Sequence, residues 1–133
     1  MSLAVILLVD DEVPFVETMT KRLTKRNLTV LSAFSGKEGL EKLKEHAEID
    51  VVILDVKMPG LDGLEALRVI KKTHPLVEVI ILTGHASAET AVEALSLGAF
   101  DYLVKPCDVS TLLKKANEAY DRKKAAETDD TER

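Results

Sequence analysis

The chain has 133 residues, of which 46% are hydrophobic and 31% are charged, and its formal net charge is −5. This composition is that of one globular domain and excludes a disordered or fibrous protein. The sequence has no run near the roughly 18 consecutive apolar residues of a membrane span, its negative charge argues against nucleic-acid binding by this chain alone, and its single cysteine, Cys107, fits a reducing compartment. We therefore expect one cytoplasmic domain with no membrane association.

Five apolar runs predict strands. Four of them are rich in Val, Ile and Leu without polar alternation, which is typical of strands buried on both faces of a sheet. These four are Leu3–Val9, Val51–Leu54, Val77–Leu82 and Phe100–Val104. A weaker run, Leu28–Ala33, follows the first of them and predicts a strand nearer an edge.

Apolar residues recur at helical spacing between and after these runs, which predicts five helices. The second, Gly36–Lys44, follows Ser35, a residue that caps helices well. Large apolar residues are lost after Arg122, so we expect the last helix to fray there into a polar tail or the start of a linker, residues 123–133. The apolar positions of the five stretches are Phe15, Met19 and Leu23; Leu40 and Leu43; Leu64, Leu67 and Ile70; Ala91, Leu95 and Leu97; and Leu112, Leu113 and Ala116.

Strand and helix alternate five times along the chain, which predicts an α/β fold with one parallel sheet and right-handed crossovers. Helices should cover both faces of the sheet, because the strands are apolar on both sides. We expect a single doubly wound, flavodoxin-like domain with five strands in the order 2-1-3-4-5.

Charged and polar residues stand at the carboxyl ends of these strands, where open parallel sheets bind their ligands. The first run ends in Asp10 and Asp11, the third in Asp55, the fourth in Thr83 and the fifth in Lys105. Carboxylates brought together repel one another unless a cation joins them, and hard oxygen ligands favour Mg²⁺. The sequence therefore predicts a magnesium site at this edge.

The same residues predict phosphoryl chemistry. A carboxylate can accept a phosphoryl group as a nucleophile, and Asp55 stands alone at the middle strand between the acid pair and the lysine. An ammonium and a hydroxyl, here Lys105 and Thr83, would bind the remaining phosphoryl oxygens. Asp10 and Asp11 could instead be an ordinary helix N-cap pair, but the matching residues at the other strand ends favour the metal site.

Taken in order, the motifs of this chain resemble those of the receiver domain of two-component response regulators, such as the chemotaxis regulator. The resemblance extends from Val5 to about Arg122, which assigns residues 1–122 to a receiver domain. The segments that carry it are Leu7–Glu12, Asp55–Gly63, Ile81–Gly84 and Gly98–Pro106.

The resemblance implies roles for individual residues. Asp11 and Asp55 would hold Mg²⁺ directly, the main-chain carbonyl of Lys57 would be the third protein ligand, and Asp10 would act partly through water. Asp55 would receive its phosphoryl group from the phosphohistidine of a sensor histidine kinase, from a phosphotransfer protein or from a small phosphodonor. The chain would catalyse only its own phosphorylation and dephosphorylation, and so would not be an enzyme in the usual sense.

The resemblance also implies a switch. Tyr102 would turn inward when Thr83 is drawn to the phosphate, and the face made by the fourth helix, fifth strand and fifth helix would then change. A homodimer through that face is a further expectation, although the sequence shows no distinct apolar patch there. We also expect a cis peptide bond before Pro106, because the chain must reverse tightly after Lys105.

Three other functions share part of this pattern. A phosphohydrolase of the haloacid-dehalogenase kind also uses Asp, Thr, Lys and Mg²⁺, but it needs a second aspartate two residues after the nucleophile, where this chain has Lys57. A flavodoxin-like protein binds the phosphate of its flavin at the loop after the first strand, and the acids at that place in this chain would repel the phosphate. An interaction module of the receiver fold that is never phosphorylated is disfavoured because every motif residue is present.

Overall fold

The computed structural model describes residues 4–58 and 60–132, and its strands and helices alternate along the chain. The strands are β1 (Val5–Val9), β2 (Thr29–Ala33), β3 (Val51–Leu54), β4 (Glu78–Thr83) and β5 (Asp101–Val104). The helices are α1 (Val13–Thr24), α2 (Gly36–Glu45), α3 (Gly63–Thr73), α4 (Ala88–Ser96) and α5 (Val109–Glu132). Every strand lies close to its predicted run. Leu3, the first residue of the first predicted run, lies outside the described residues.

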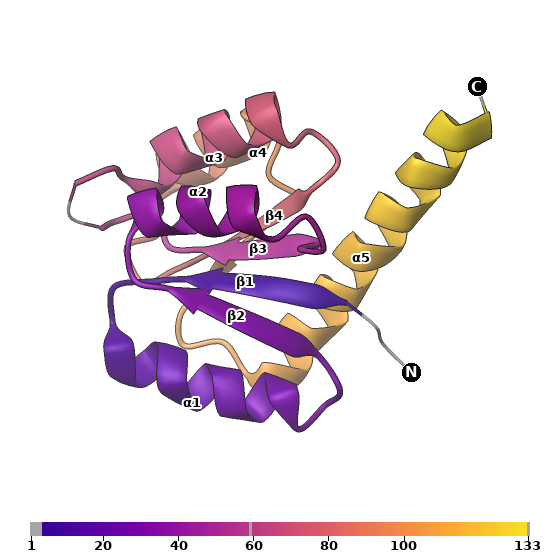
Figure 1. Ribbon diagram of the computed structural model, residues 1–133. Coiled ribbons are helices and arrows are strands. Elements are labelled where there is room, and N and C mark those ends of the chain that lie inside the picture. Colours follow the sequence, from indigo (N-terminus) through magenta and orange to yellow (C-terminus); the bar gives the residue numbers. More distant parts are fainter. Residues whose placement is uncertain (1–3, 59, 133) are drawn as a thin grey trace.

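All five strands are parallel, in the order β2-β1-β3-β4-β5. The predicted doubly wound fold is therefore confirmed. Helices α2, α3 and α4 cover one face of the sheet, and α1 and α5 cover the other (Figure 1). In the described part of the chain, no helix combines the length and the hydropathy that crossing a bilayer requires.

The sheet separates two apolar cores. Along β1, Leu7 and Val9 belong to the core beneath α2, α3 and α4, whereas Ile6 and Leu8 belong to the core beneath α1 and α5. Successive side chains of a strand point to opposite faces, so an uninterrupted apolar run such as β3 contributes to both cores. This is why the strands could be recognised from apolar runs alone.

Polar side chains fix the start of three helices. Ser35 accepts a hydrogen bond from the backbone of Glu38 at 3.1 Å and caps α2 as predicted. Asp62 does the same for α3. At α4, Ser87 and Thr90 form a reciprocal capping box. These caps satisfy N–H groups that have no partner inside their helices.

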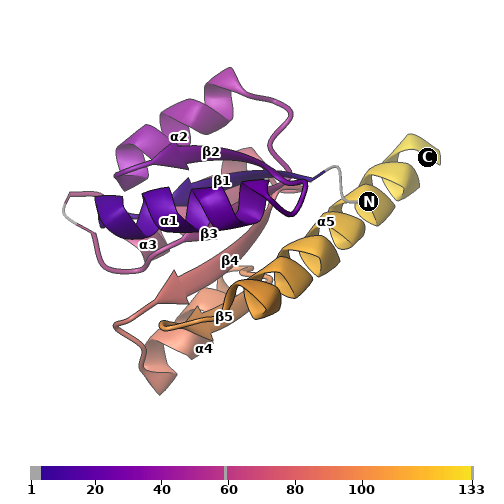
Figure 2. The same cartoon turned by 90° about the horizontal axis from the view of Figure 1, so that it is seen from below.

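Helix α5 is longer than the sequence predicts. It continues to Glu132 and projects beyond the sheet (Figures 1 and 2), so the expectation that it frays after Arg122 is wrong. Lys123 is buried, and its Nζ lies 3.0 Å from Oδ1 of Asp50, just before β3. Arg122 Nε lies 3.0 Å from Oε2 of the buried Glu78, which begins β4. We call these two ion pairs the α5 clamp.

The face made by α4, β5 and α5, here called the α4-β5-α5 face, carries few buried side chains on α4 and β5. Ala94 is the buried residue of α4, and the side chains of β5 are half-buried or exposed. Three large apolar side chains lie exposed on α4 and β5: Val92, Leu95 and Val104. The structure thus reveals apolar surface that was not evident as a patch in the sequence.

Candidate functional site

Three aspartates meet at the carboxyl edge of the sheet. Asp10 and Asp11 follow β1, and Asp55 follows the neighbouring strand β3. One carboxylate oxygen from each can be chosen so that all three atoms lie within 4.8 Å of one another. Asp10 and Asp55 are buried, whereas Asp11 is exposed. This is a cluster of acids that could hold a metal ion, as predicted from the strand ends.

Lys105 reaches this cluster from the end of β5. Its ammonium nitrogen lies 2.7 Å from Oδ2 of Asp10, 2.8 Å from Oε1 of Glu12 and 3.3 Å from Oδ2 of Asp55. The Lys105–Pro106 peptide bond is cis, the conformation predicted from the sequence. The fold therefore joins an amine to carboxylates that are up to 95 positions away along the chain.

The electrostatics of the cluster are set by burial and by these contacts. Burial raises the pKa of the Asp10 carboxyl above its usual value, although the hydrogen bond from Lys105 and the backbone N–H of Glu12 oppose the shift. Burial alone would lower the pKa of Lys105, but its bonds to Asp10 and Glu12 and the charge of Asp55 outweigh burial and raise it. Lys105 is thus a permanent cation facing more carboxylates than it can neutralise.

This imbalance is the feature that fits a divalent cation. Asp10 stays buried among acids even though burial penalises its charge, and a hard cation would relieve that penalty through oxygen ligands. Lys57 lies at the same place, and its backbone N–H donates to Oδ1 of Asp55 at 3.3 Å. A hollow of about 470 Å³ opens over the cluster, and its lining residues are Asp11, Glu12, Asp55, Lys57, Met58 and His85.

Thr83 and Tyr102 are not in contact through any described hydrogen bond. Thr83 is fully buried at the end of β4, and its hydroxyl oxygen accepts the backbone N–H of His85 at 3.0 Å. The Tyr102 hydroxyl lies 2.7 Å from that of Thr90 in the first turn of α4. Tyr102 is half-buried and packs against the core under α4. The structure therefore connects Tyr102 to the helix cap rather than to Thr83.

Gly63 fixes the loop that carries Asp55. Its backbone N–H donates to the carbonyl of Val56 at 2.7 Å. A Cβ at this position would collide with the Asp55 carbonyl and would lie 2.6 Å from the Val56 Cα. Only glycine lets α3 begin this close to the end of β3, so the residue defines where the Asp55 backbone lies.

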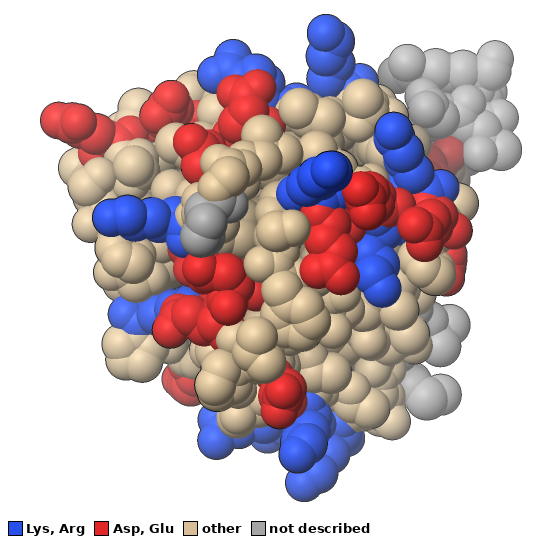
Figure 3. Space-filling model, turned by 60° about the vertical axis from the view of Figure 1, so that its left-hand side comes forward, with Lys and Arg blue, Asp and Glu red and all other residues tan. Residues whose placement is uncertain are grey.

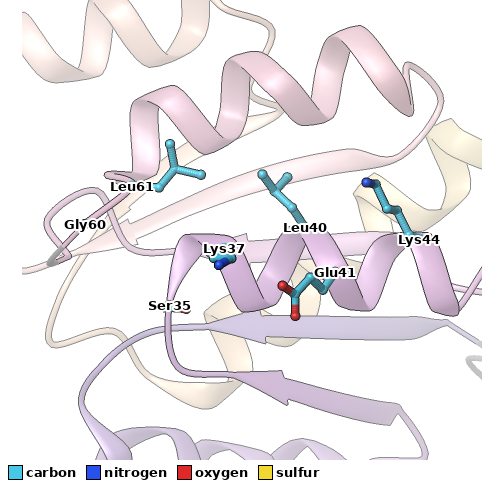
Figure 4. A pocket seen from close by; sticks show the side chains of 7 residues that line it. All are labelled: Ser35, Lys37, Leu40, Glu41, Lys44, Gly60 and Leu61. Carbon is cyan, nitrogen blue, oxygen red and sulfur yellow. The ribbon is translucent and has the colours of Figure 1, made fainter.

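A larger hollow, of about 580 Å³, lies between α2 and the segment that leads into α3 (Figure 4). Leu40 and Leu61 project into the space between these elements, and Lys37 and Lys44 stand on α2. None of the predicted site residues lines it. Acidic and basic side chains are interspersed over the face of the molecule in Figure 3. The chemistry predicted from the sequence is therefore concentrated at the aspartate cluster.

Two residues of the site were not assigned a role from the sequence. Glu12 directly follows the acid pair, so its adjacency could have signalled its bond to Lys105. Phe15 was assigned to the core by its helical spacing, yet its ring centroid lies 4.3 Å from the ammonium of Lys105. The pattern of apolar residues cannot show that a ring also faces a charge.

Known proteins give the same picture. Residues 6–117 match the family model described as response regulator receiver domain. The chain is 41% identical over 107 residues to the transcriptional regulatory protein ZraR of Escherichia coli, and the matched segment makes up 80% of this chain and 24% of that protein. It is 39% identical over 109 residues to the DNA-binding transcriptional regulator NtrC of Escherichia coli, over 82% of this chain and 23% of that protein. The chain thus spans about a quarter of these relatives.

Solved structures agree as well. A response regulator receiver domain protein from Clostridium thermocellum superposes with a TM-score of 0.89 at 44% identity, over 93% of this chain and 99% of that one. NtrX from Brucella abortus superposes with a TM-score of 0.91 at 34% identity, over 99% of this chain and 30% of that one. These relatives do not favour the phosphohydrolase or flavodoxin alternatives. The chain belongs to the receiver domains of two-component response regulators.

Proposed function

We propose that Asp55 is the phosphoacceptor of this receiver domain. The observation that carries the proposal is the reach of Lys105 across the sheet, which places an ammonium beside both Asp10 and Asp55. The donor would be the phosphohistidine of a sensor histidine kinase, a phosphotransfer protein or a small phosphodonor. Such a relay would operate in the cytoplasm.

Asp55, Lys105 and Thr83 would have different roles in the phosphoryl transfer. An oxygen of Asp55 forms the new bond to phosphorus while the bond from phosphorus to the donor breaks, and the product is an acyl phosphate. The ammonium of Lys105 and the hydroxyl of Thr83 donate hydrogen bonds to phosphoryl oxygens, which offsets their charge. Thr83 ends β4, the strand next to β3, and the ammonium of Lys105 reaches across from the end of β5 to 3.3 Å from Asp55, so little reorganisation is required.

Mg²⁺ would supply charge neutralisation at the transferred group. Asp11, Asp55 and the main-chain carbonyl of Lys57 would hold it, with Asp10 acting partly through water. Since no separate substrate is turned over, the chain would catalyse only its own phosphorylation and dephosphorylation and would not be an enzyme in the usual sense.

The α4-β5-α5 face would report the phosphorylated state. Tyr102 pairs with Ile81 of β4, and Thr83, two positions further on, lies on the same face of the sheet. Movement of Thr83 toward a phosphoryl oxygen would therefore change the space open to Tyr102, whose hydroxyl is bonded to Thr90 of α4. A shift of Tyr102 would therefore reach α4 directly and change the population of its conformers. The exposed Val92, Leu95 and Val104 offer apolar area for a partner there, and a second copy of this chain is one partner included in the proposal.

Intact-protein mass spectrometry with acetyl phosphate and Mg²⁺ tests the assignment. Wild type should gain the mass of one phosphoryl group, and Asp55→Asn should gain none. Asp121→Asn, which changes an exposed aspartate of α5 far from the site, serves as the matched control and should behave as wild type. Phosphorylation that persists in Asp55→Asn would overturn the proposal.

A further inference from the structure

Four groups surround the ammonium of Lys105. Three are carboxylates, from Asp10, Glu12 and Asp55, and the fourth is the ring of Phe15, whose centroid lies at 4.3 Å. Phe15 and Glu12 both come from the start of α1, so one short segment supplies two of the four. A cation within about 6 Å of a ring centroid is attracted by the ring's electron-rich face.

The four contacts would not persist equally through phosphorylation. If Asp10 and Asp55 held a cation, their attraction for the Lys105 ammonium would weaken, whereas the contacts from Glu12 and Phe15 would remain. Glu12 is exposed, with 63% of its side chain accessible, so its attraction is screened by water. Phe15 is half-buried and packs into the core under α1 and α5. Its position is therefore fixed by the fold, whereas that of Glu12 is free to change.

A ring also holds a cation without competing for its hydrogen bonds. Carboxylates occupy the N–H groups that Lys105 must present to a phosphoryl oxygen, whereas a ring face attracts the charge and leaves those donors available. The Lys105 side chain is 14% exposed. A hollow of about 350 Å³ opens beside the pair, and its lining includes Phe15, Lys105 and Cys107. Loss of the ring would enlarge that hollow and admit water beside the ammonium.

We propose that Phe15 is a positioning residue that holds the Lys105 ammonium toward Asp55 through its ring face once the carboxylates have turned to the metal. The proposal rests on the proposed function, because it concerns the lysine that binds the transferred phosphoryl group. The rate of phosphorylation should scale with the fraction of molecules in which the Lys105 ammonium points toward Asp55. Phe15 raises that fraction.

Substitutions at Phe15 separate the effect of the aromatic ring from the effect of apolar side-chain volume. Phe15→Leu keeps an apolar side chain in the core but removes the ring, and phosphorylation by phosphoramidate with Mg²⁺ should slow roughly three- to tenfold. Phe15→Tyr keeps a ring and should restore most of the rate. Phe100→Leu is the matched control: it removes a ring that lies 5.5 Å from the guanidinium carbon of Arg122, away from the aspartates, and should leave the rate as in wild type.

A measurement without phosphodonor gives an independent readout. In wild type with Mg²⁺, the ε-methylene protons of Lys105 should be shifted upfield by the ring current of Phe15, and Phe15→Tyr should keep that shift. A pentafluorophenyl ring at position 15 matches the shape but reverses the charge of the ring face, so Lys105 should leave it. Near-wild-type melting curves establish that each variant is folded.

The outcomes are distinct. Wild type that is phosphorylated at Asp55 while Phe15→Leu reacts equally fast, with the Lys105 shift absent from wild type, overturns this inference and leaves the proposed function standing. Wild type that is not phosphorylated at Asp55 overturns the proposed function itself. Loss of rate in Phe15→Leu with recovery in Phe15→Tyr supports the inference. Equal loss in both variants overturns it, because ring identity would then be irrelevant.

Discussion

The hydroxyl oxygens of Tyr102 and Thr90 lie 2.7 Å apart, and this hydrogen bond joins β5 to the first turn of α4. Thr90 also bonds Ser87 in the capping box of the same helix. One hydroxyl therefore takes part both in the start of α4 and in the position of the tyrosine, so a rotation of Tyr102 changes the bonding of the cap.

Thr90→Val should destabilise the protein by about 1 kcal/mol, because it removes the capping hydroxyl as well as the bond to Tyr102. Thr90→Ser keeps the hydroxyl and should cost much less. Urea denaturation of Thr90→Val, Tyr102→Phe and the double variant forms a thermodynamic cycle. A coupling energy near zero would show that the two hydroxyls act independently, contrary to the structure.

Gly63→Ala should damage the site more than the fold. Its Cβ would collide with the Asp55 carbonyl, so we expect a loss of stability of about 2 kcal/mol and a fall in phosphorylation of up to roughly a hundredfold as Asp55 is displaced. At Gly84 a Cβ would meet only Lys105 Cβ, at 4.0 Å. Gly84→Ala should therefore stay within about 0.5 kcal/mol of wild type in stability. Similar effects of the two substitutions would refute the steric argument.

Asp10→Asn should stabilise the metal-free protein at neutral pH. Because the pKa of Asp10 is raised by burial in the folded state, folding disfavours its charged form. In wild type this lowers the free energy of unfolding as pH rises from the ordinary aspartate value through the raised one. The amide lacks that ionisation and keeps one oxygen, which can accept from the Glu12 N–H or from Lys105, the two donors that bind separate oxygens of the carboxylate.

Urea denaturation in EDTA from acidic to neutral pH measures this effect. The advantage of Asp10→Asn should grow with pH across that window and then level off, and the stabilisation of wild type by Mg²⁺ should shrink in the variant. A variant that is less stable than wild type at neutral pH without metal would contradict the account of Asp10.

The α5 clamp makes a prediction of its own. Lys123→Met leaves the buried Asp50 without its nearest cation and should cost about 3 kcal/mol. Lys124 lies 3.6 Å from the same oxygen but is 49% exposed. Lys124→Met is the matched control and should cost at most about 1 kcal/mol. Thermal or chemical denaturation compares them, and equal losses would mean that burial of Lys123 is energetically unimportant.

Much of the fold was predictable because its signals are local. An uninterrupted apolar run such as Val51–Leu54 indicates a strand buried on both faces, and Ser35 signals a helix start regardless of the rest of the chain. The length of α5 was not predictable in this way. Lys123 and Arg122 read as solvated residues, and their partners Asp50 and Glu78 are distant in sequence. The burial of Lys123 and the ion pair of the exposed Arg122 therefore emerge only from the packed structure.

The site was predictable to a similar degree. The proximity of Asp10, Asp55 and Lys105 could be predicted because the carboxyl ends of parallel strands meet at one edge of the sheet. The ring of Phe15 over the ammonium and the bond from Tyr102 to Thr90 depend on side-chain directions at the start of α1 and α4. No periodicity in the sequence encodes those directions.

The length of α5 beyond its clamp has a mechanical consequence. A helix rises 1.5 Å per residue, so the part from Lys123 to Glu132 extends about 14 Å past the point where Asp50 and Glu78 grip it. A tilt of about 10° at the grip would displace the far end by about 2 Å. A small rotation of α5 about the amino ends of β3 and β4, at the opposite edge of the sheet from Asp55, would therefore be amplified along the helix.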